Sequence, residues 1–198
     1  MSRRPLFFIP LVTLLLGFIS KGTNDIRIAF YECSNPYNID STLFEVRKDQ
    51  AYFQLDKNLR PKKLKSKGFI RLKNNPKDYF TAYLINTSDS TFHATRQDFS
   101  LIMVQEALNE EGKWKPIEHW IYSTCGNSYM SPLELLPGKY VMIPIKKYTG
   151  SFQTKFRLKM QQNDSITFYS ETFEGSIDKG QFINQQSSIQ VFDIMGPR

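Results

Sequence analysis

The stretch SFQTKFRLKM, residues 151–160, alternates apolar and hydrophilic side chains and decides the fold of this chain. One set of alternate positions is mainly apolar: Phe152, Thr154, Phe156, Leu158 and Met160. The other set is hydrophilic: Gln153, Lys155, Arg157 and Lys159. Successive side chains of a strand point to opposite faces, so the pattern predicts one face on a core and one in water. Strands of this kind belong to antiparallel sheets.

The rest of the chain supplies further strands to cover that apolar face. Residues 78–86 are apolar at both sets of alternate positions, which predicts a central strand covered on both faces. A helix from Thr42, with Glu45 in its first turn, is an alternative to the short strand at 43–46. Pro144 is expected to end a strand or to lie on an edge. The other predicted strands are 23–32, 51–55, 69–72, 92–94, 99–108, 114–122, 133–135, 140–145, 166–169 and 173–177.

Strands separated by turns, with no alternation of strands and helices, predict an antiparallel β-sandwich. The motif LLPGKY, residues 135–140, resembles the corner of many immunoglobulin-like domains, where a tyrosine entering a strand hydrogen-bonds back across a turn. The fold class is therefore all-β, immunoglobulin-like or fibronectin-like in broad class. A chain of 198 residues suits one such domain.

The first residues have the layout of a secretory leader. Arg3 and Arg4 precede a mostly apolar run at 6–19, and Ser20 and Gly22 are small residues near a cleavage position. An uncleaved membrane anchor is the alternative, although the run is shorter than the roughly 20 residues of a membrane-spanning helix. We expect a signal peptide at 1–22 and one domain at 23–198, with a loose tail from about 179. The protein would then be periplasmic, on the outer surface or secreted, with no membrane span after cleavage.

Export gives the two cysteines a possible structural role. Cys33 and Cys125 are the only pair, and an oxidising compartment favours a disulfide between them. Two buried free thiols are the alternative. The cysteines and histidines have no spacing typical of a metal site, so we expect neither metal nor cofactor.

The charge of the chain does not indicate nucleic-acid binding. The formal net charge is +7, and removal of the leader's Arg3, Arg4 and Lys21 leaves 23 basic and 19 acidic side chains. That small excess fits a solvated surface. The dense basic run at 60–67 could meet an anionic surface, or it could be a solvated loop.

The sequence contains no recognisable catalytic set. His93 and His119 are the only imidazoles, no GxSxG motif is present, and no pair of carboxylates stands out. His119 lies close in sequence to Glu118, Ser123 and Cys125, which leaves an enzyme acting on envelope polymers as an alternative. We expect no catalytic residue.

The densest group of unusual residues is at 114–129. Its aromatic members are Trp114, Trp120, Tyr122 and Tyr129. Such rings could form a sugar-stacking or protein-contact patch, or they could pack in a corner of the core.

Three segments carry a resemblance. WIYSTCGNSY at 120–129, LELLPG at 133–138 and YTGSFQTKFR at 148–157 are similar to a group of uncharacterised exported proteins of Bacteroidota. The resemblance covers about the middle half of the chain and implies a β-domain of the cell envelope, with no known activity. The turn placement is also similar to that of small β-sandwich proteinase inhibitors and fibronectin-like modules. The expected function is a non-enzymatic module that binds a protein or glycan; a hydrolase and a proteinase inhibitor are the alternatives.

Overall fold

A computed structural model describes residues 29–42, 44, 47–56, 78–121, 130–163 and 166–182. These residues form antiparallel strands and a short 3-10 helix, so the all-β prediction is confirmed. The elements are β1 (Tyr37–Asn38), β2 (Ala51–Leu55), β3 (Tyr79–Asn86), β4 (Phe92–Gln97), β5 (Ser100–Leu101), β6 (Met103–Leu108), β7 (Trp114–Pro116), β8 (Met130–Leu135), β9 (Lys139–Lys146), β10 (Phe152–Gln161), β11 (Thr167–Tyr169), β12 (Phe173–Ile177) and η2 (Lys179–Phe182).

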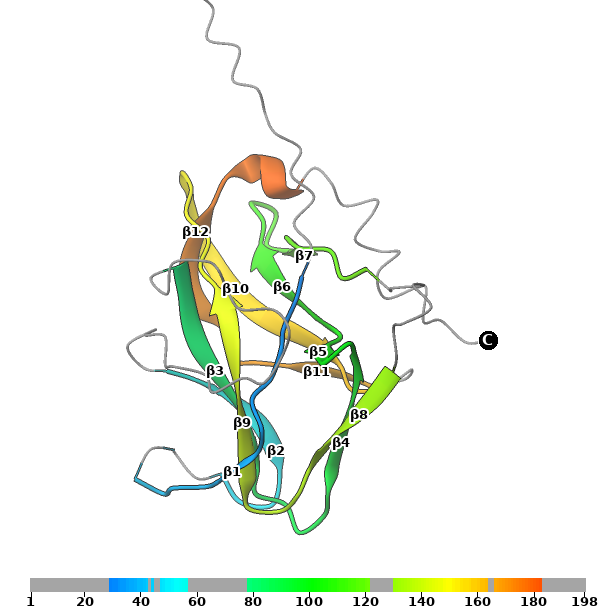
Figure 1. Ribbon diagram of the computed structural model, residues 1–198. Coiled ribbons are helices and arrows are strands. Elements are labelled where there is room, and N and C mark those ends of the chain that lie inside the picture. The colour runs from blue at the N-terminus through cyan, green and yellow to red at the C-terminus, as the bar shows by residue number, and fades with distance from the viewer. Residues whose placement is uncertain are drawn as a thin grey trace, which may run out of the picture.

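The strands form three antiparallel sheets in a sandwich-like arrangement (Figure 1). A four-stranded sheet has the order β1-β9-β3-β2, and a three-stranded sheet has the order β5-β4-β8. In the five-stranded sheet the order is β11-β10-β6-β7, and β12 also pairs with β10. The immunoglobulin-like assignment remains a prediction.

Strand β10 has the alternation predicted from its sequence. Phe156, Leu158 and Met160 are buried, whereas Gln153 and Lys155 are exposed. Arg157 and Lys159 are half-buried on the hydrophilic side. The apolar face of β10 therefore lies on the core, as expected.

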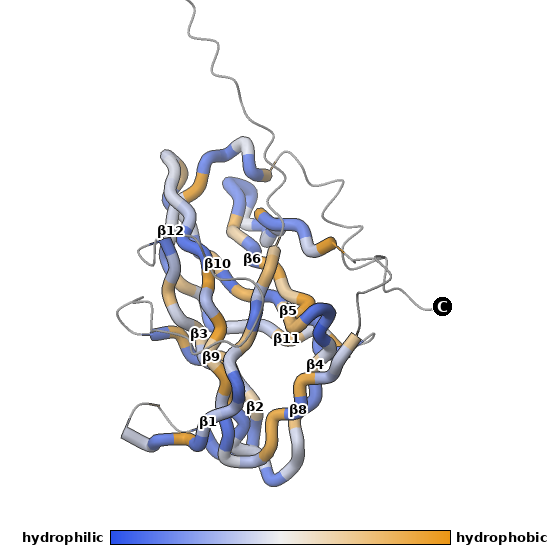
Figure 2. The backbone as a smooth tube through the Cα atoms, in the orientation of Figure 1, coloured by the Kyte–Doolittle hydropathy of each residue, from blue (hydrophilic) through white to orange (hydrophobic). Residues whose placement is uncertain are grey.

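The main core takes side chains from all three sheets. Leu84 and Ile143 come from the four-stranded sheet, Leu158 from the five-stranded sheet, and Leu133 from the three-stranded sheet. In Figure 2 much of the apolar colour lies on the strands, and the turns at hairpin ends are mostly hydrophilic. Burial of this apolar surface is the main favourable contribution to folding.

Strand β3 is covered on both faces, which confirms the prediction for residues 78–86. Its Phe80, Ala82 and Leu84 lie in the main core. On the opposite face Tyr83 and Ile85 join a second cluster. The other members of that cluster are Phe44, Tyr52 and Met142, with Tyr37, Ile39 and Tyr140 packed against them.

Residues 29–34 run between the sheets as an extended segment, shown in blue in Figure 1. The amide of Ala29 donates to the carbonyl of His119, and the amide of Leu101 donates to the carbonyl of Tyr31. The amide of Ser34 reaches the carbonyl of Met142 on β9. Of the strand predicted at 23–32, the described residues 29–32 form only an isolated bridge between Glu32 and Ser100. In this segment Phe30 is exposed and its neighbours Ala29 and Tyr31 are buried.

Two predicted strands are shorter than expected. The segment at 99–108 is split by Ile102 into β5 and β6, because its first part pairs with β4 and its second part pairs with β10. The strand predicted at 114–122 ends at Pro116, and residues 117–121 continue without a named strand.

The Pro137–Gly138 turn between β8 and β9 forms as expected. The amide of Lys139 donates to the carbonyl of Leu136, and Gly138 has a φ of 69°. A positive φ at this position is the type II arrangement that favours glycine.

Pro144 neither ends β9 nor interrupts its pairing, so that part of the expectation is wrong. It lies opposite Thr81 of β3. The amide of Met142 donates to Ser34 Oγ, away from β3. Two residues further along a strand the backbone nitrogen points the same way, so Pro144 removes no donor from the β3–β9 ladder.

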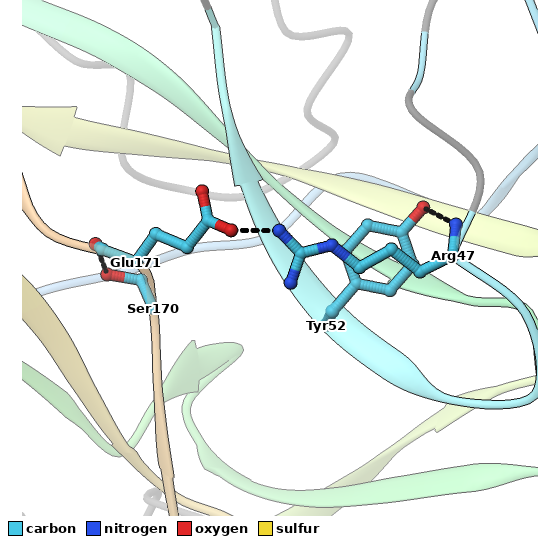
Figure 3. Close-up of polar contacts among 4 residues, drawn as sticks. All are labelled: Arg47, Tyr52, Ser170 and Glu171. Atoms are coloured by element: carbon cyan, nitrogen blue, oxygen red, sulfur yellow. Dashed lines mark hydrogen bonds and ion pairs between the residues drawn. The ribbon is translucent and has the colours of Figure 1, made fainter.

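A surface ion pair joins the residue range before β2 to the range between β11 and β12 (Figure 3). Arg47 pairs with Glu171, and its guanidinium also lies over the ring of Tyr52 at 5.1 Å from the ring centroid. Both charged side chains are exposed, so the pair adds little stability.

Several predictions fall outside the described residues. These are the leader at 1–22, residues 23–28 of the first predicted strand, the strand or helix at 43–46 apart from Phe44, the strand at 69–72, the basic run at 60–67, Tyr122, Cys125, Tyr129 and the tail beyond 182.

Candidate functional site

The structure separates the aromatic residues predicted to form a binding patch. Trp120 is 3% exposed and belongs to the main core, which fits the alternative that it packs in a core corner. Trp114 is half-buried at the start of β7. Tyr122 and Tyr129 lie outside the described residues. Of the four, only Trp114 can therefore be placed on a surface.

The strand register brings side chains from four strands to the outer face around Trp114. Arg157 of β10 lies opposite Glu106 of β6, and Lys159 lies opposite Tyr169 of β11. Trp114 lies opposite Leu108, two residues beyond Glu106. Residues two apart on a strand share a face, so Trp114, Glu106, Arg157, Lys159 and Tyr169 all lie on the face of the sheet opposite Phe156, Leu158 and Met160, which we call the outer face.

Arg157 lies between two aromatic rings. Its Cζ atom is 4.5 Å from the ring centroid of Trp114 and 4.1 Å from that of Tyr169. Both distances are within the range of a cation–π interaction. Tyr169 is 44% exposed, so part of its ring is open to solvent. We call Trp114, Arg157 and Tyr169 the stack.

Glu106 fixes the position of the Arg157 guanidinium through contacts to one carboxylate oxygen. Nε of Arg157 donates to Glu106 Oε2 at 2.7 Å, and Nη2 is 2.6 Å from the same oxygen. Lys159 Nζ is 3.4 Å from Glu106 Oε1. The Glu106 side chain is 5% exposed, and a carboxylate this buried is stable only when it is paired. The two cations provide that pairing.

Sequence reasoning found part of this site. The alternation at 151–160 places Arg157 and Lys159 on the hydrophilic face, and Trp114 was singled out as an aromatic. Glu106 and Tyr169 were not. Each lies in a short segment with no distinctive pattern, and the strand register alone brings them beside Arg157.

A second polar cluster surrounds the buried carboxylate of Glu118. Oε2 accepts hydrogen bonds from the hydroxyl of Tyr31 and from the amide of Gln105, the latter at 2.8 Å. Oε1 accepts from Gln105 Nε2 at 3.0 Å and from the hydroxyl of Tyr148 at 2.5 Å. Burial, followed by the negative charge of Glu118, raises the pKa of Tyr31 well above its ordinary value. Tyr31 therefore remains a donor, and the cluster ties the 29–34 segment to the sheets.

The histidines do not come together. His93 is exposed on β4, and His119 is buried next to Glu118. Both oxygens of Glu118 are already occupied by the donors just described. Within the described ranges no group of three or more His, Cys, Asp and Glu side chains could hold a metal ion.

Cys33 is buried, and its sulfur accepts a hydrogen bond from Nη1 of Arg96 at 3.6 Å. Its predicted partner, Cys125, is not among the described residues, so the disulfide remains a prediction.

Among the described residues, no helix has the length and apolar character needed to cross a membrane. Comparison with protein-family models, with curated proteins and with solved structures gave no match.

Proposed function

We propose that this chain is an exported, non-enzymatic module that binds a protein or a glycan through the outer face of its five-stranded sheet. The observation that carries the proposal is the stack. Trp, Tyr and Arg are the residues most enriched at energetically important contacts of protein interfaces. Aromatic rings also provide the apolar faces on which sugars stack. Here all three residue types lie together on one partly exposed sheet face.

The order of the stack favours binding. A side chain already fixed in its bound geometry loses little conformational entropy when a ligand arrives. Glu106 engages the Nε edge of Arg157, and two aromatic rings lie within cation–π distance of its guanidinium. Export is part of the proposal and is supported by the leader-like residues at the start of the chain.

The proposal is tested with ring-removal variants of the purified protein. Trp114→Ala and Tyr169→Ala are compared with the wild type on a glycan array and in crosslinking pulldowns from cell envelope. Leu136→Ala is the control, because Leu136 is an exposed apolar residue in the β8–β9 turn, away from the stack. Circular dichroism checks that each variant is folded.

We expect each ring removal to weaken binding by about tenfold or more, which is typical of a residue at the centre of an interface. Leu136→Ala should bind as the wild type does. Equal binding by all three variants would contradict the use of this face. Turnover in a hydrolase screen, together with no captured ligand, would favour the enzyme alternative.

A further inference from the structure

The guanidinium of Arg157 is only half used by the protein. An arginine carries five N–H donors. Nε and Nη2 both meet Glu106 Oε2. In the described part of the chain Nη1 has no hydrogen-bond partner, and the side chain is 23% exposed. The edge formed by Nη1 and the second hydrogen of Nη2 is therefore still available.

The orientation of that free edge is set by its surroundings. The rings of Trp114 and Tyr169 lie over the guanidinium, which restricts the tilt of its plane. Glu106 engages the Nε edge, which restricts rotation within the plane. The Nη1–Nη2 edge of a guanidinium carries two parallel N–H bonds, the geometry that matches the two oxygens of a carboxylate.

The local charge also favours an anion. The ion pairs at the stack join two cationic side chains, Arg157 and Lys159, to the carboxylate of Glu106. A further carboxylate would meet the unused N–H donors of Arg157. A cationic ligand would be repelled by Arg157, whose guanidinium already occupies the position beside the two rings.

We propose that the stack is a binding site for the carboxylate of an acidic polysaccharide, with Arg157 as the bidentate donor. This inference rests on the proposed binding function and names the ligand class. A uronic acid carries a carboxylate and an apolar sugar face on one ring, so it could engage Arg157 and stack beside Trp114 or Tyr169 in a single pose.

The position of the site favours a polysaccharide over an extended acidic peptide. Extended peptides commonly bind by adding a strand to a free sheet edge. Arg157 lies on β10, which is paired with β6 on one side and with β11 and β12 on the other. The donor of the stack, Arg157, therefore lies on the face of the sheet, between the end strands β7 and β11 that carry Trp114 and Tyr169.

The test measures binding of the full chain to three soluble polymers by calorimetry at low and high salt. Polygalacturonate carries uronate groups, dextran is a neutral glycan, and poly-L-glutamate carries the same carboxylate on a peptide. Arg157→Lys retains the positive charge and removes the guanidinium, the bidentate hydrogen-bond donor. Lys139→Gln removes one positive charge at the start of β9, on the four-stranded sheet, and is the control. Circular dichroism confirms that both variants fold.

We expect the wild type to bind polygalacturonate more tightly than dextran or poly-L-glutamate. Arg157→Lys should weaken that binding by about tenfold or more, since bidentate recognition is lost while the charge remains. Lys139→Gln should stay within about twofold of the wild type, because Lys139 lies on a different sheet from the stack and salt screens charges on the protein surface.

Equal binding of polygalacturonate by the wild type and Arg157→Lys would overturn the inference, and so would stronger binding of poly-L-glutamate. Binding of dextran or of an envelope protein that depends on Trp114, without uronate binding, would overturn this inference and leave the proposed function standing. If no ligand depends on Trp114, Tyr169 or Arg157, both fail.

Discussion

At the scale of single residues, the buried carboxylates decide which segments meet. Glu118 accepts hydrogen bonds from Tyr31, Gln105 and Tyr148, which lie on three separate parts of the chain. A buried acceptor that loses a donor keeps its desolvation cost, so each of these donors matters more than an exposed one. Glu106 has the same role on the outer face, where it orders Arg157 and Lys159.

Tyr31→Phe should change the pH dependence of stability. Burial and the charge of Glu118 raise the pKa of Tyr31 well above 10. Below pH 10 the hydroxyl is protonated in the folded and unfolded states and contributes no slope. Above pH 10 the unfolded chain releases this proton and the folded chain retains it, so the free energy of unfolding falls as pH rises.

Urea unfolding at pH 8, 9, 10 and 11 measures this effect. The phenylalanine variant should be less stable at pH 8, by about 1 to 3 kcal/mol, because Glu118 loses a donor. Its stability should then fall less steeply than that of the wild type above pH 10. Parallel slopes for the two proteins would show that the proton on Tyr31 is not retained in the folded state.

Some residue-level features had no signal in the sequence. Asp98 and Phe99 both have positive φ values, 51° and 68°, in the tight turn between β4 and β5. Turns of this kind normally contain Asn or Gly, so an Asp–Phe pair does not predict one. The turn forms because Gln97 and Ser100 pair across it. Neighbouring strands have imposed a conformation that the residues themselves disfavour.

At the scale of elements, the pattern of single strands was predictable and their pairing was not. The alternation at 151–160 and the two-sided apolar run at 78–86 predict β10 and β3 because each pattern depends only on local burial. The strand is split at Ile102 because β5 pairs with β4 whereas β6 pairs with β10. This long-range pairing is not revealed by the sequence alone. The candidate site could be predicted only in part for the same reason, because strand register alone brings Glu106 and Tyr169 beside Arg157.

Gly150→Ala should be strongly destabilising. A Cβ atom at Gly150 would overlap the backbone of Ile177 and Asp178 at the end of β12. Backbone atoms cannot move aside as a side chain can, so the start of β10 or the end of β12 must shift. We expect a loss of about 2 kcal/mol or more, near the upper range for overpacking.

Gly180→Ala provides the matched control, because a Cβ there meets nothing within 4 Å. Its effect on the free energy of unfolding should stay within about 0.5 kcal/mol, as for most surface substitutions. Both variants are compared with the wild type by urea unfolding. Similar stabilities for the two alanine variants would mean that β12 does not hold Gly150 as closely as described.

At the scale of the whole molecule, the three sheets depend on one another. The main core includes Leu84, Leu158 and Leu133, one from each sheet, so no sheet can bury its apolar face alone. The 29–34 segment adds hydrogen bonds to His119, Leu101 and Met142. An all-β class was predictable because periodicity reports burial. The division into three sheets was not, because it is set by long-range pairing.

Shared burial predicts a single cooperative unfolding transition for the described elements, and the two tryptophans can test it. Trp120 lies in the main core, and Trp114 lies on the outer face of the five-stranded sheet. Trp114→Phe and Trp120→Phe each leave one indole as a local probe. In each variant the fluorescence midpoint in urea should coincide with the far-UV circular dichroism midpoint, as two-state unfolding requires.

Trp120→Phe should lower both midpoints together, because it removes volume from the core. If the fluorescence of Trp114 changed at a lower urea concentration than the circular dichroism signal, the outer face carrying the stack would be unfolding on its own. That result would separate the order of the binding face from the stability of the core.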